Sequence, residues 1–200
     1  MITIHSNETD TKNIYKLMIG TIVPRPIAFV STVSNDGINN LAPFSFFMGV
    51  SASPPTLAIS IAKKGFVGNY KDTNKNILDT NEFVVNIVTE NIANAMNLTA
   101  GEFAPEIDEF EISKLTPIQS KFVKPKRVKE SPINMECKLM QVIEIGNPTT
   151  TNLIIGEIIC FHIEENIFEN FRIDIEKLKP IARLAGNSYC KVNDIFELTR

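Results

Sequence analysis

The sequence predicts a mainly β protein: an antiparallel barrel, closed or nearly closed, that carries short helical insertions. Successive apolar runs show either the two-residue alternation or the β-branched content of strands. Turn residues separate these runs, and the helical patterns between them are few and short. Together these features are typical of an antiparallel barrel.

The length and composition predict a single domain over residues 1–200. Hydrophobic residues make up 44% of the 200 residues, which is enough for a buried core. The net charge of -3 gives no electrostatic reason to expect a nucleic acid or an anionic membrane as a partner.

The cysteines and the N-terminus predict a cytoplasmic protein. Cys137, Cys160 and Cys190 lie far apart, fit no CxxC spacing and cannot all pair, so a reducing compartment is expected. The first ten residues lack the basic start and long apolar stretch of a signal peptide. No apolar run approaches the roughly 20 residues that span a bilayer.

The first elements expected are a short helix and a strand. Residues 7–18 carry apolar side chains at helical spacing, with Ser6 and Asn7 available as caps. Pro24 and Pro26 then exclude a helix, so a largely buried strand is expected over residues 27–32.

A hairpin and a third strand follow. Asn35, Asp36 and Gly37 tolerate positive φ and predict a tight turn. The second strand, antiparallel to the first, is expected over residues 39–48. Pro54 and Pro55 interrupt the chain before a third strand over residues 56–62, where apolar residues alternate.

The middle of the chain predicts two helices and a strand. Asp72 is expected to cap a helix whose first turn holds Thr73 and whose apolar residues include Ile77. Residues 82–88 are dense in β-branched side chains and predict a strand, whereas residues 92–100 have the Ala and Met content of a helix.

The last third of the chain predicts a long hairpin. Residues 101–132 are polar and broken by prolines, so an excursion over the surface is expected. Strands are expected over residues 135–145 and 153–164, joined by a turn at residues 146–148. One helical turn over residues 174–178 and a tail over residues 181–200 that packs back on the body complete the prediction.

Five segments of the chain resemble the flavin reductase-like domain family, the split barrels that bind FMN. The segments are VPRPIAFVST, DGxxNLAPFSFF, KDTxxNI, SPINMEC and PIARLAG, and they extend over nearly the whole chain. The resemblance implies an FMN-binding split β-barrel that forms a homodimer with its flavin near the subunit interface.

The KDT segment is the candidate site for the cofactor's phosphate. A phosphate favours an ammonium group, hydroxyls and the free amides of a helix start. Lys71 and Thr73 supply the first two, and Asp72 is expected to cap the helix and fix the geometry. The alternative is that Asp72 and Thr73 only cap a helix and that Lys71 is solvated.

Small polar side chains at strand ends are the candidate contacts for the rest of the cofactor. The resemblance implies that Ser31 and Thr32 lie near the isoalloxazine ring and that the second strand offers main-chain contacts. It also places Ser45 and the end of the third strand near the ribityl or phosphate portion. The alternative is that these hydroxyls bond to neighbouring backbone. The predicted cofactor-binding residues are Ser31, Thr32, Asn40, Leu41, Ala42, Ser45, Ser60, Ile61, Ala62, Lys71, Asp72 and Thr73.

Two arginine-bearing segments have less defined roles. Arg25 lies between two prolines, where it either approaches the phosphate or fixes the start of the first strand by an ion pair. Residues 183–186 resemble the family's RxGG segment near the flavin, with Ala185 in place of a glycine. Tyr189 is expected either to form a wall of the pocket or to pack the tail.

No metal site and no catalytic acid, base or nucleophile is predicted. His5 and His162 are isolated and lack carboxylates at ligand spacing, so they are poor metal ligands. The cysteines have no adjacent base in sequence and are expected to be small core residues.

The chemistry expected is that of the flavin. The resemblance implies an oxidoreductase in which NAD(P)H reduces bound FMN. However, NADH-using reductases of the family commonly carry Gly-Asp-His where this chain reads GNPTTTNLIIGE. This difference favours the flavoredoxin-like branch and the alternative of an FMN electron carrier that serves a redox protein partner. A third alternative is a barrel that binds another phosphorylated ligand.

Overall fold

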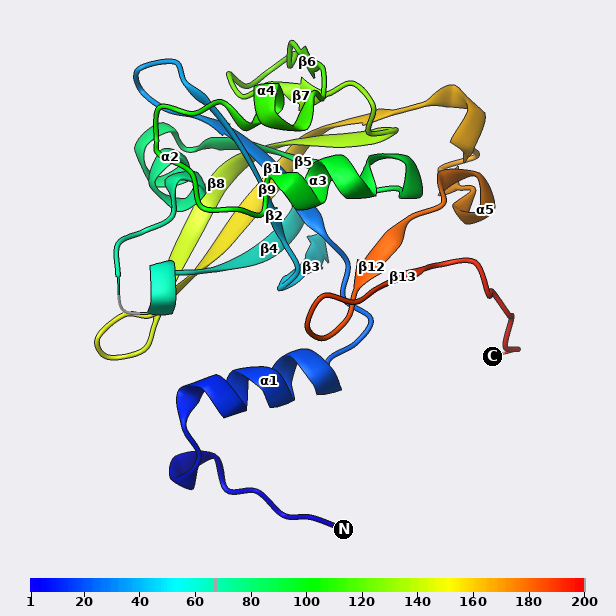
Figure 1. Cartoon of the computed structure of the whole chain (residues 1–200). Helices are drawn as coiled ribbons and strands as arrows, with labels where there is room; N and C mark the ends of the chain where they lie inside the picture. Colours follow the sequence, from blue (N-terminus) through cyan, green and yellow to red (C-terminus); the bar gives the residue numbers. More distant parts are fainter. Residues whose placement is uncertain (67, 200) are drawn as a thin grey trace.

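The computed structural model describes residues 1–66 and 68–199, and a seven-stranded antiparallel sheet forms its centre (Figure 1). The strand order is β2-β1-β5-β8-β9-β4-β3. The strands are β1 (Ala28–Val33), β2 (Asn39–Phe44), β3 (Phe47–Ala52), β4 (Pro55–Ala62), β5 (Glu82–Ile87), β8 (Ile133–Ile145) and β9 (Thr151–Ile163). The prediction of a mainly β, antiparallel fold is therefore confirmed.

Short helices and small hairpins surround the sheet. The α-helices are α1 (Thr11–Thr21), α2 (Asp72–Thr80), α3 (Ala93–Leu98), α4 (Glu109–Ser113) and α5 (Ile175–Leu178). The 3-10 helices are η1 (Ser6–Glu8), η2 (Lys64–Phe66), η3 (Glu90–Ile92) and η4 (Glu165–Ile167). The small hairpins pair β6 (Pro117–Ile118) with β7 (Arg127–Val128), β10 (Phe168–Glu169) with β11 (Arg172–Ile173), and β12 (Ile181–Arg183) with β13 (Tyr189–Lys191).

The sheet curls around one apolar cluster. Side chains from β1, β2, β4, β5, β8 and β9 join Ile77 of α2 in this inner cluster. Its packing is tight where the Phe83 ring of β5 reaches Gly156 of β9, because a Cβ at Gly156 would lie 2.4 Å from Cζ of the buried Phe83. Glycine at this position thus lets the aromatic ring fill the interior.

A second cluster lies on the outer face of β1 and β2. Phe29 and Leu41 belong to it, whereas Ala28 and Val30 belong to the inner cluster, as the two-residue alternation of a strand requires. Met96 of α3 and Phe110 of α4 cover this outer face. Both faces of β1 are therefore buried, which explains why its run is apolar on both sides.

The expected second strand is divided in two. The run over residues 39–48 was predicted as one strand, and this is wrong: β2 ends at Phe44 and β3 begins at Phe47. These strands lie at opposite edges of the sheet, and the amide of Ser60 in β4 donates to the Phe46 carbonyl (2.8 Å). The short link over residues 45–46 thus carries the chain from one sheet edge to the other. The hairpin between β1 and β2 is confirmed, with φ of 84° at Gly37.

The first helix begins later than predicted. Asp10, rather than Ser6 or Asn7, caps α1, and its carboxylate accepts the amide of Asn13 (2.9 Å). No residue of α1 is buried, and the helix stands away from the sheet (Figure 1).

The cap of α2 also differs from the prediction. Lys71 is the residue at the cap position and Asp72 is the first helical residue, so the expected capping role of Asp72 is wrong. Its carboxylate lies 3.7 Å from the ammonium of Lys64. An acidic side chain in the first turn still interacts favourably with the helix dipole.

Most of the remaining elements match the prediction. Strands β4, β5, β8 and β9, helix α3 and the turn of α5 occur where they are expected. Residues 101–132, by contrast, are more than a surface excursion, because Glu109, Phe110, Val123 and Val128 are buried against the body. The tail packs back only as far as β13, and Phe196 and Leu198 are 78% and 80% exposed; Arg200 lies outside the described residues. Within the described residues, no helix is long and apolar enough to cross a membrane.

Candidate functional site

Three cavities adjoin at Pro43 and Phe44, where β2 ends. The arginine cavity has a volume of about 350 Å³ and is lined by residues that include Tyr15, Arg25, Met96, Arg183 and Tyr189. The helix cavity, of about 140 Å³, lies at the start of α2 and includes Asn40, Lys71, Asp72, Thr73 and Glu109. The strand cavity, of about 350 Å³, lies at the end of β4 and includes Ser45, Ser60, Ala62, Lys63 and Lys64.

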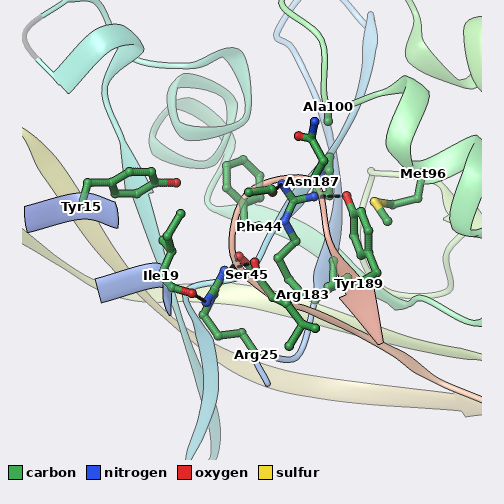
Figure 2. A pocket seen from close by; sticks show the side chains of 14 residues that line it. Tyr15, Ile19, Arg25, Phe44, Ser45, Met96, Ala100, Arg183, Asn187 and Tyr189 are labelled. Carbon is green, nitrogen blue, oxygen red and sulfur yellow. Dashed lines mark hydrogen bonds between the residues drawn. The ribbon is translucent and has the colours of Figure 1, made fainter. Parts of the chain in front are cut away.

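Arg25 is buried at the floor of the arginine cavity (Figure 2). Its Nη1 donates to the carbonyls of Ile19 and Ile22 (both 2.7 Å), and its Nη2 donates to the carbonyl of Leu184 (2.9 Å). Its Nε contacts Ser45 Oγ at 3.3 Å. Burial lowers the pKa of Arg25 from its usual value, and neighbouring Tyr15 opposes the shift. Among the described residues Arg25 forms no ion pair; it fixes the start of β1 through carbonyl groups.

Arg183 brings a second positive charge to the same cavity. Its amide donates to the Arg25 carbonyl (2.8 Å), and the Arg25 amide donates back to the Arg183 carbonyl (3.0 Å). The guanidinium stacks on the ring of Tyr189 at 4.4 Å from its centroid and donates to the Tyr189 hydroxyl. No Asp or Glu among the described residues lines this cavity, so its electrostatic potential is positive.

Lysines surround the other two cavities. Lys71 lines both, and its ammonium lies 5.7 Å from the centroid of the Phe44 ring. Burial lowers the pKa of Lys71, and Glu102 partly opposes the shift. Lys63 and Lys64 line the strand cavity, where Glu102 is the acidic neighbour. Cations therefore outnumber carboxylates around the strand cavity, whereas the helix cavity is lined by two lysines and by Asp72, Glu102 and Glu109.

The start of α2 adds backbone donors beside Lys71. The first hydrogen bond inside the helix runs from the Lys75 amide to the Lys71 carbonyl (3.0 Å). The amides of residues 72–74 precede it and lie outside the helical ladder. They point along the axis at the positive end of the helix dipole, which favours an anion at this place.

A buried polar network holds α2 against β2. The Thr73 hydroxyl donates to Asn40 Oδ1 (2.7 Å), and the Thr32 hydroxyl reaches the same oxygen at 3.3 Å. Asn40 Nδ2 donates to Glu109 Oε1 (2.9 Å), and the Leu41 amide donates to Glu109 Oε2 (3.0 Å). Burial raises the pKa of Glu109, although these hydrogen bonds oppose the shift.

The structure brings most of the predicted cofactor-binding residues to the three cavities. The two regions on which the prediction rests, the ends of the early strands and the start of α2, are in hydrogen-bond contact through Thr73 and Asn40. The predicted residues that line a cavity are Asn40, Ala42, Ser45, Ser60, Ala62, Lys71, Asp72 and Thr73.

Four predicted residues are not brought to the cavities. Leu41 belongs to the outer cluster and Ile61 to the inner one, because each lies between two cavity-lining neighbours on a strand and points the opposite way. Ser31 is buried and its hydroxyl donates to the Lys126 carbonyl (2.5 Å). Thr32 is buried in the Asn40 network. The side chains of these four residues thus have structural partners.

Sequence reasoning missed several cavity residues. Glu109 lies in a stretch that was predicted as a surface excursion, although Asp108 before the apolar Phe110 is a helix-cap signal. Tyr15 belongs to the predicted first helix, and nothing in its local sequence distinguishes it. Lys63 and Lys64 follow the third strand directly and continue the row of polar residues at its end.

The arrangement combines charge, free amides and apolar walls. The cationic groups and the start of α2 suit an anionic group, whereas Pro43, Phe44 and Met96 provide apolar surface beside them. The three cavities therefore combine the features that a ligand with an anionic group and an apolar part requires.

Comparison with known proteins gives a consistent match along the chain. The profile of the flavin reductase like domain matches residues 19–181. The nitrilotriacetate monooxygenase component B of Bacillus cereus has a similar structure, with a TM-score of 0.95 and 43% identity over 99% of this chain and 98% of that one. The 2-nitrobenzoate 2-nitroreductase NbaA of Pseudomonas fluorescens gives a TM-score of 0.90 and 31% identity over 100% of this chain and 96% of that one.

More distant structures share the fold. A protein of Shewanella frigidimarina described as a flavin reductase with a split barrel domain gives a TM-score of 0.85 at 20% identity, with both chains covered completely. A flavoredoxin of Desulfovibrio vulgaris (Miyazaki F) gives 0.76 at 21% identity over 98% of this chain and 97% of that one. The predicted split-barrel fold is confirmed.

The Glu109→Gln variant should lack the contribution that the titration of Glu109 makes to the pH dependence of the free energy of unfolding. Burial raises the folded pKa of Glu109 above its unfolded value, so the folded chain binds this proton more tightly. The free energy of unfolding of the wild type should therefore fall, relative to the variant, as pH rises from about 4 toward 7. Urea unfolding at several pH values measures this difference. Glu111→Gln, an exposed residue of the same helix, is the matched control, and parallel profiles for Glu109→Gln and wild type would contradict the assignment.

Proposed function

We propose, from the premise that the chain belongs to the flavin reductase like domain family, that it is an oxidoreductase that binds FMN in the three adjoining cavities. The observation that carries the proposal is the coincidence of charge and shape at Phe44. There, Lys71, the start of α2 and two arginines surround a space with apolar walls.

The phosphate of FMN fits the start of α2. Lys71 provides an ammonium group, and the amides of residues 72–74 provide donors at the positive end of the helix dipole. The ammonium of Lys64 in η2 lies 3.7 Å from the Asp72 carboxylate and offsets its negative charge beside the phosphate. The Thr73 hydroxyl donates to Asn40 and holds the start of α2, with its free amides, in place for the phosphate. The small cavity at the start of α2, of about 140 Å³, favours FMN over a dinucleotide flavin.

The arginine cavity fits the ring system. Pro43, Phe44 and Met96 supply apolar walls, and the Arg183–Tyr189 stack forms a further wall. When bound, the flavin supplies the redox chemistry. Arg25 and Arg183 then place positive charge where the added electrons increase negative charge on the ring.

The electron donor divides the proposal into two alternatives. The similarity to a monooxygenase component and a nitroreductase supports a reductase, for which NAD(P)H is the electron donor that we propose. The turn between β8 and β9 lacks a histidine, and neither His5 nor His162 lines a cavity, which favours the alternative of an FMN carrier reduced by a protein partner.

A homodimer is part of the proposal. Helix α1 has no buried residue, and its apolar side chains Leu17 and Met18 are 40% and 42% exposed. In β3, the apolar Met48 and Val50 are 59% and 50% exposed. Since Tyr15 of the same helix lines the arginine cavity, a second subunit that covers α1 also borders the flavin site.

A cytoplasmic location remains part of the proposal. Cys137, Cys160 and Cys190 are all unpaired in the structure. Free cysteines are typical of a reducing compartment.

Replacing Lys71 or Thr73 with Ala should weaken FMN binding by about 1 to 3 kcal/mol, because Lys71→Ala removes a charged hydrogen bond and Thr73→Ala removes the tie that positions the start of α2. Titration of flavin-free protein with FMN measures the change in affinity, with the quenching of flavin fluorescence as the signal. Lys75→Ala is the matched control, because Lys75 lies on α2 and pairs with Asp79 (2.6 Å). Unchanged affinity in Lys71→Ala would show that the phosphate lies elsewhere.

Anaerobic addition of NADH or NADPH should bleach the flavin absorption of the purified protein within seconds if the chain is a reductase. Bleaching that requires a reduced redox protein would identify the carrier. A colourless protein that takes up no added FMN would reject both alternatives, and would leave a barrel for another phosphorylated ligand.

Leu17→Glu combined with Met18→Glu should convert the dimer to a monomer, because two charges would enter the proposed apolar interface. Light scattering during gel filtration measures the mass. Lys16→Glu, an exposed change on the same helix, should leave the dimer intact. A wild-type protein that elutes as a monomer at all concentrations would reject the interface.

A further inference from the structure

Glu136, Cys160 and His162 form a cluster outside the flavin site. The pairing of β8 with β9 places Glu136 opposite Cys160, and His162 lies two residues further along the same face of β9. One ligand atom from each side chain lies within 4.8 Å of the other two. None of the three residues lines the cavities at Phe44. The sequence predicted no metal site because it showed no carboxylate at ligand spacing from His162, whereas the pairing of β8 with β9 brings Glu136 to it.

Glu136 is held as a carboxylate by backbone groups. Its side chain has no exposed surface, and its oxygens accept the amides of Lys121 (2.7 Å), Phe122 (2.6 Å) and Val123 (3.1 Å). Such outer hydrogen bonds orient a metal-binding carboxylate. Oε1 also lies 2.6 Å from His162 Nε2, so one proton links these two atoms.

The distances suit a small metal ion with a soft ligand. Cys160 Sγ lies 3.5 Å from His162 Nε2. In a tetrahedral zinc site, bonds of about 2.0 Å to nitrogen and 2.3 Å to sulfur place these two atoms about 3.5 Å apart. Oxygen and nitrogen ligands lie about 3.3 Å apart in such a site, so Oε1 and Nε2 need a modest separation to admit the ion.

We propose that Glu136, Cys160 and His162 bind Zn²⁺ or a similar divalent metal ion, with water as the fourth ligand. The ion replaces the proton between Nε2 and Oε1; the imidazole then carries its proton on Nδ1, and the thiol releases its proton to solvent. Solvent reaches the cluster, because Cys160 is partly exposed and the His162 side chain is 22% exposed. Arg127 does not occupy the carboxylate, since it donates to the Gln119 carbonyl and to Asn134.

The site has a structural consequence. Through Glu136, the ion would tie the segment 121–123 to the two longest strands of the sheet. Binding to the folded chain raises the midpoint of thermal unfolding, and the midpoint rises with the logarithm of the free Zn²⁺ concentration once this concentration exceeds the Kd. The proposal is independent of the flavin, since it uses no residue of that site.

Calorimetric titration of the untagged, chelator-treated protein with Zn²⁺ tests the site. One ion should bind per chain, and Cys160→Ser and His162→Gln should each weaken binding more than about tenfold. The chain's other histidine and other partly exposed cysteine give matched controls, His5→Gln and Cys190→Ser, which should bind as wild type. If wild type binds no Zn²⁺, or if the Cys160→Ser variant binds it as well as wild type, the three-ligand assignment is overturned.

A second readout does not depend on the variants. Zn²⁺ should slow the alkylation of Cys160 by iodoacetamide, measured by mass spectrometry, and leave the rate at Cys190 in the same molecule unchanged. Equal rates at Cys160 with and without Zn²⁺ would reject thiolate ligation. If His162→Gln lowers the midpoint of thermal unfolding in the presence of chelator, this substitution destabilises the metal-free fold. The Zn²⁺ affinity of the near-isosteric Cys160→Ser variant then decides whether the site exists.

Discussion

The hydrogen bonds of Asn40 are the constraint on which the candidate site depends. Asn40 Oδ1 accepts the Thr73 hydroxyl at the start of α2, while Nδ2 donates to Glu109 of α4. One buried amide thus joins a strand to two helices that are distant in sequence. Both of its ends are satisfied, so rotating the amide would leave a carboxylate against an oxygen and a hydroxyl against a nitrogen. The position of α2, and with it Lys71 beside Phe44, follows from this arrangement.

The sequence predicts the strands well because their signal is local. Alternation in β4, β-branched density in β5 and the turn residues between β8 and β9 depend only on neighbouring residues. The division between β2 and β3 is different. The residues around Phe46 are as apolar as the strands that flank them, and the break exists because the Phe46 carbonyl pairs with β4, which lies next to the edge strand β3 on the other side of the sheet. No pattern within residues 39–48 shows that the chain crosses from one edge of the sheet to the other.

The site shows the same division between local and distant information. The KDT segment is readable from the sequence, since a lysine, a hydroxyl and a helix start lie together. Strand alternation decides which of its companions reach the cavities: Asn40 and Ala42 do, whereas Leu41 between them faces outward. The meeting of Arg183 with Arg25 is not readable, because it depends on a backbone bridge between residues 158 positions apart.

The way in which the buried Arg25 is held explains why the arginine cavity can attract an anion. Its guanidinium donates to three carbonyl groups, which are dipoles, and to no carboxylate among the described residues. Carbonyl dipoles satisfy the donors and lower the cost of burial, but they leave the net charge in place. A carboxylate in the same position would cancel the field at a distance of several ångströms. Because Arg183 adds a second charge and no Asp or Glu of the described chain lines the cavity, the positive potential remains for a ligand to neutralise.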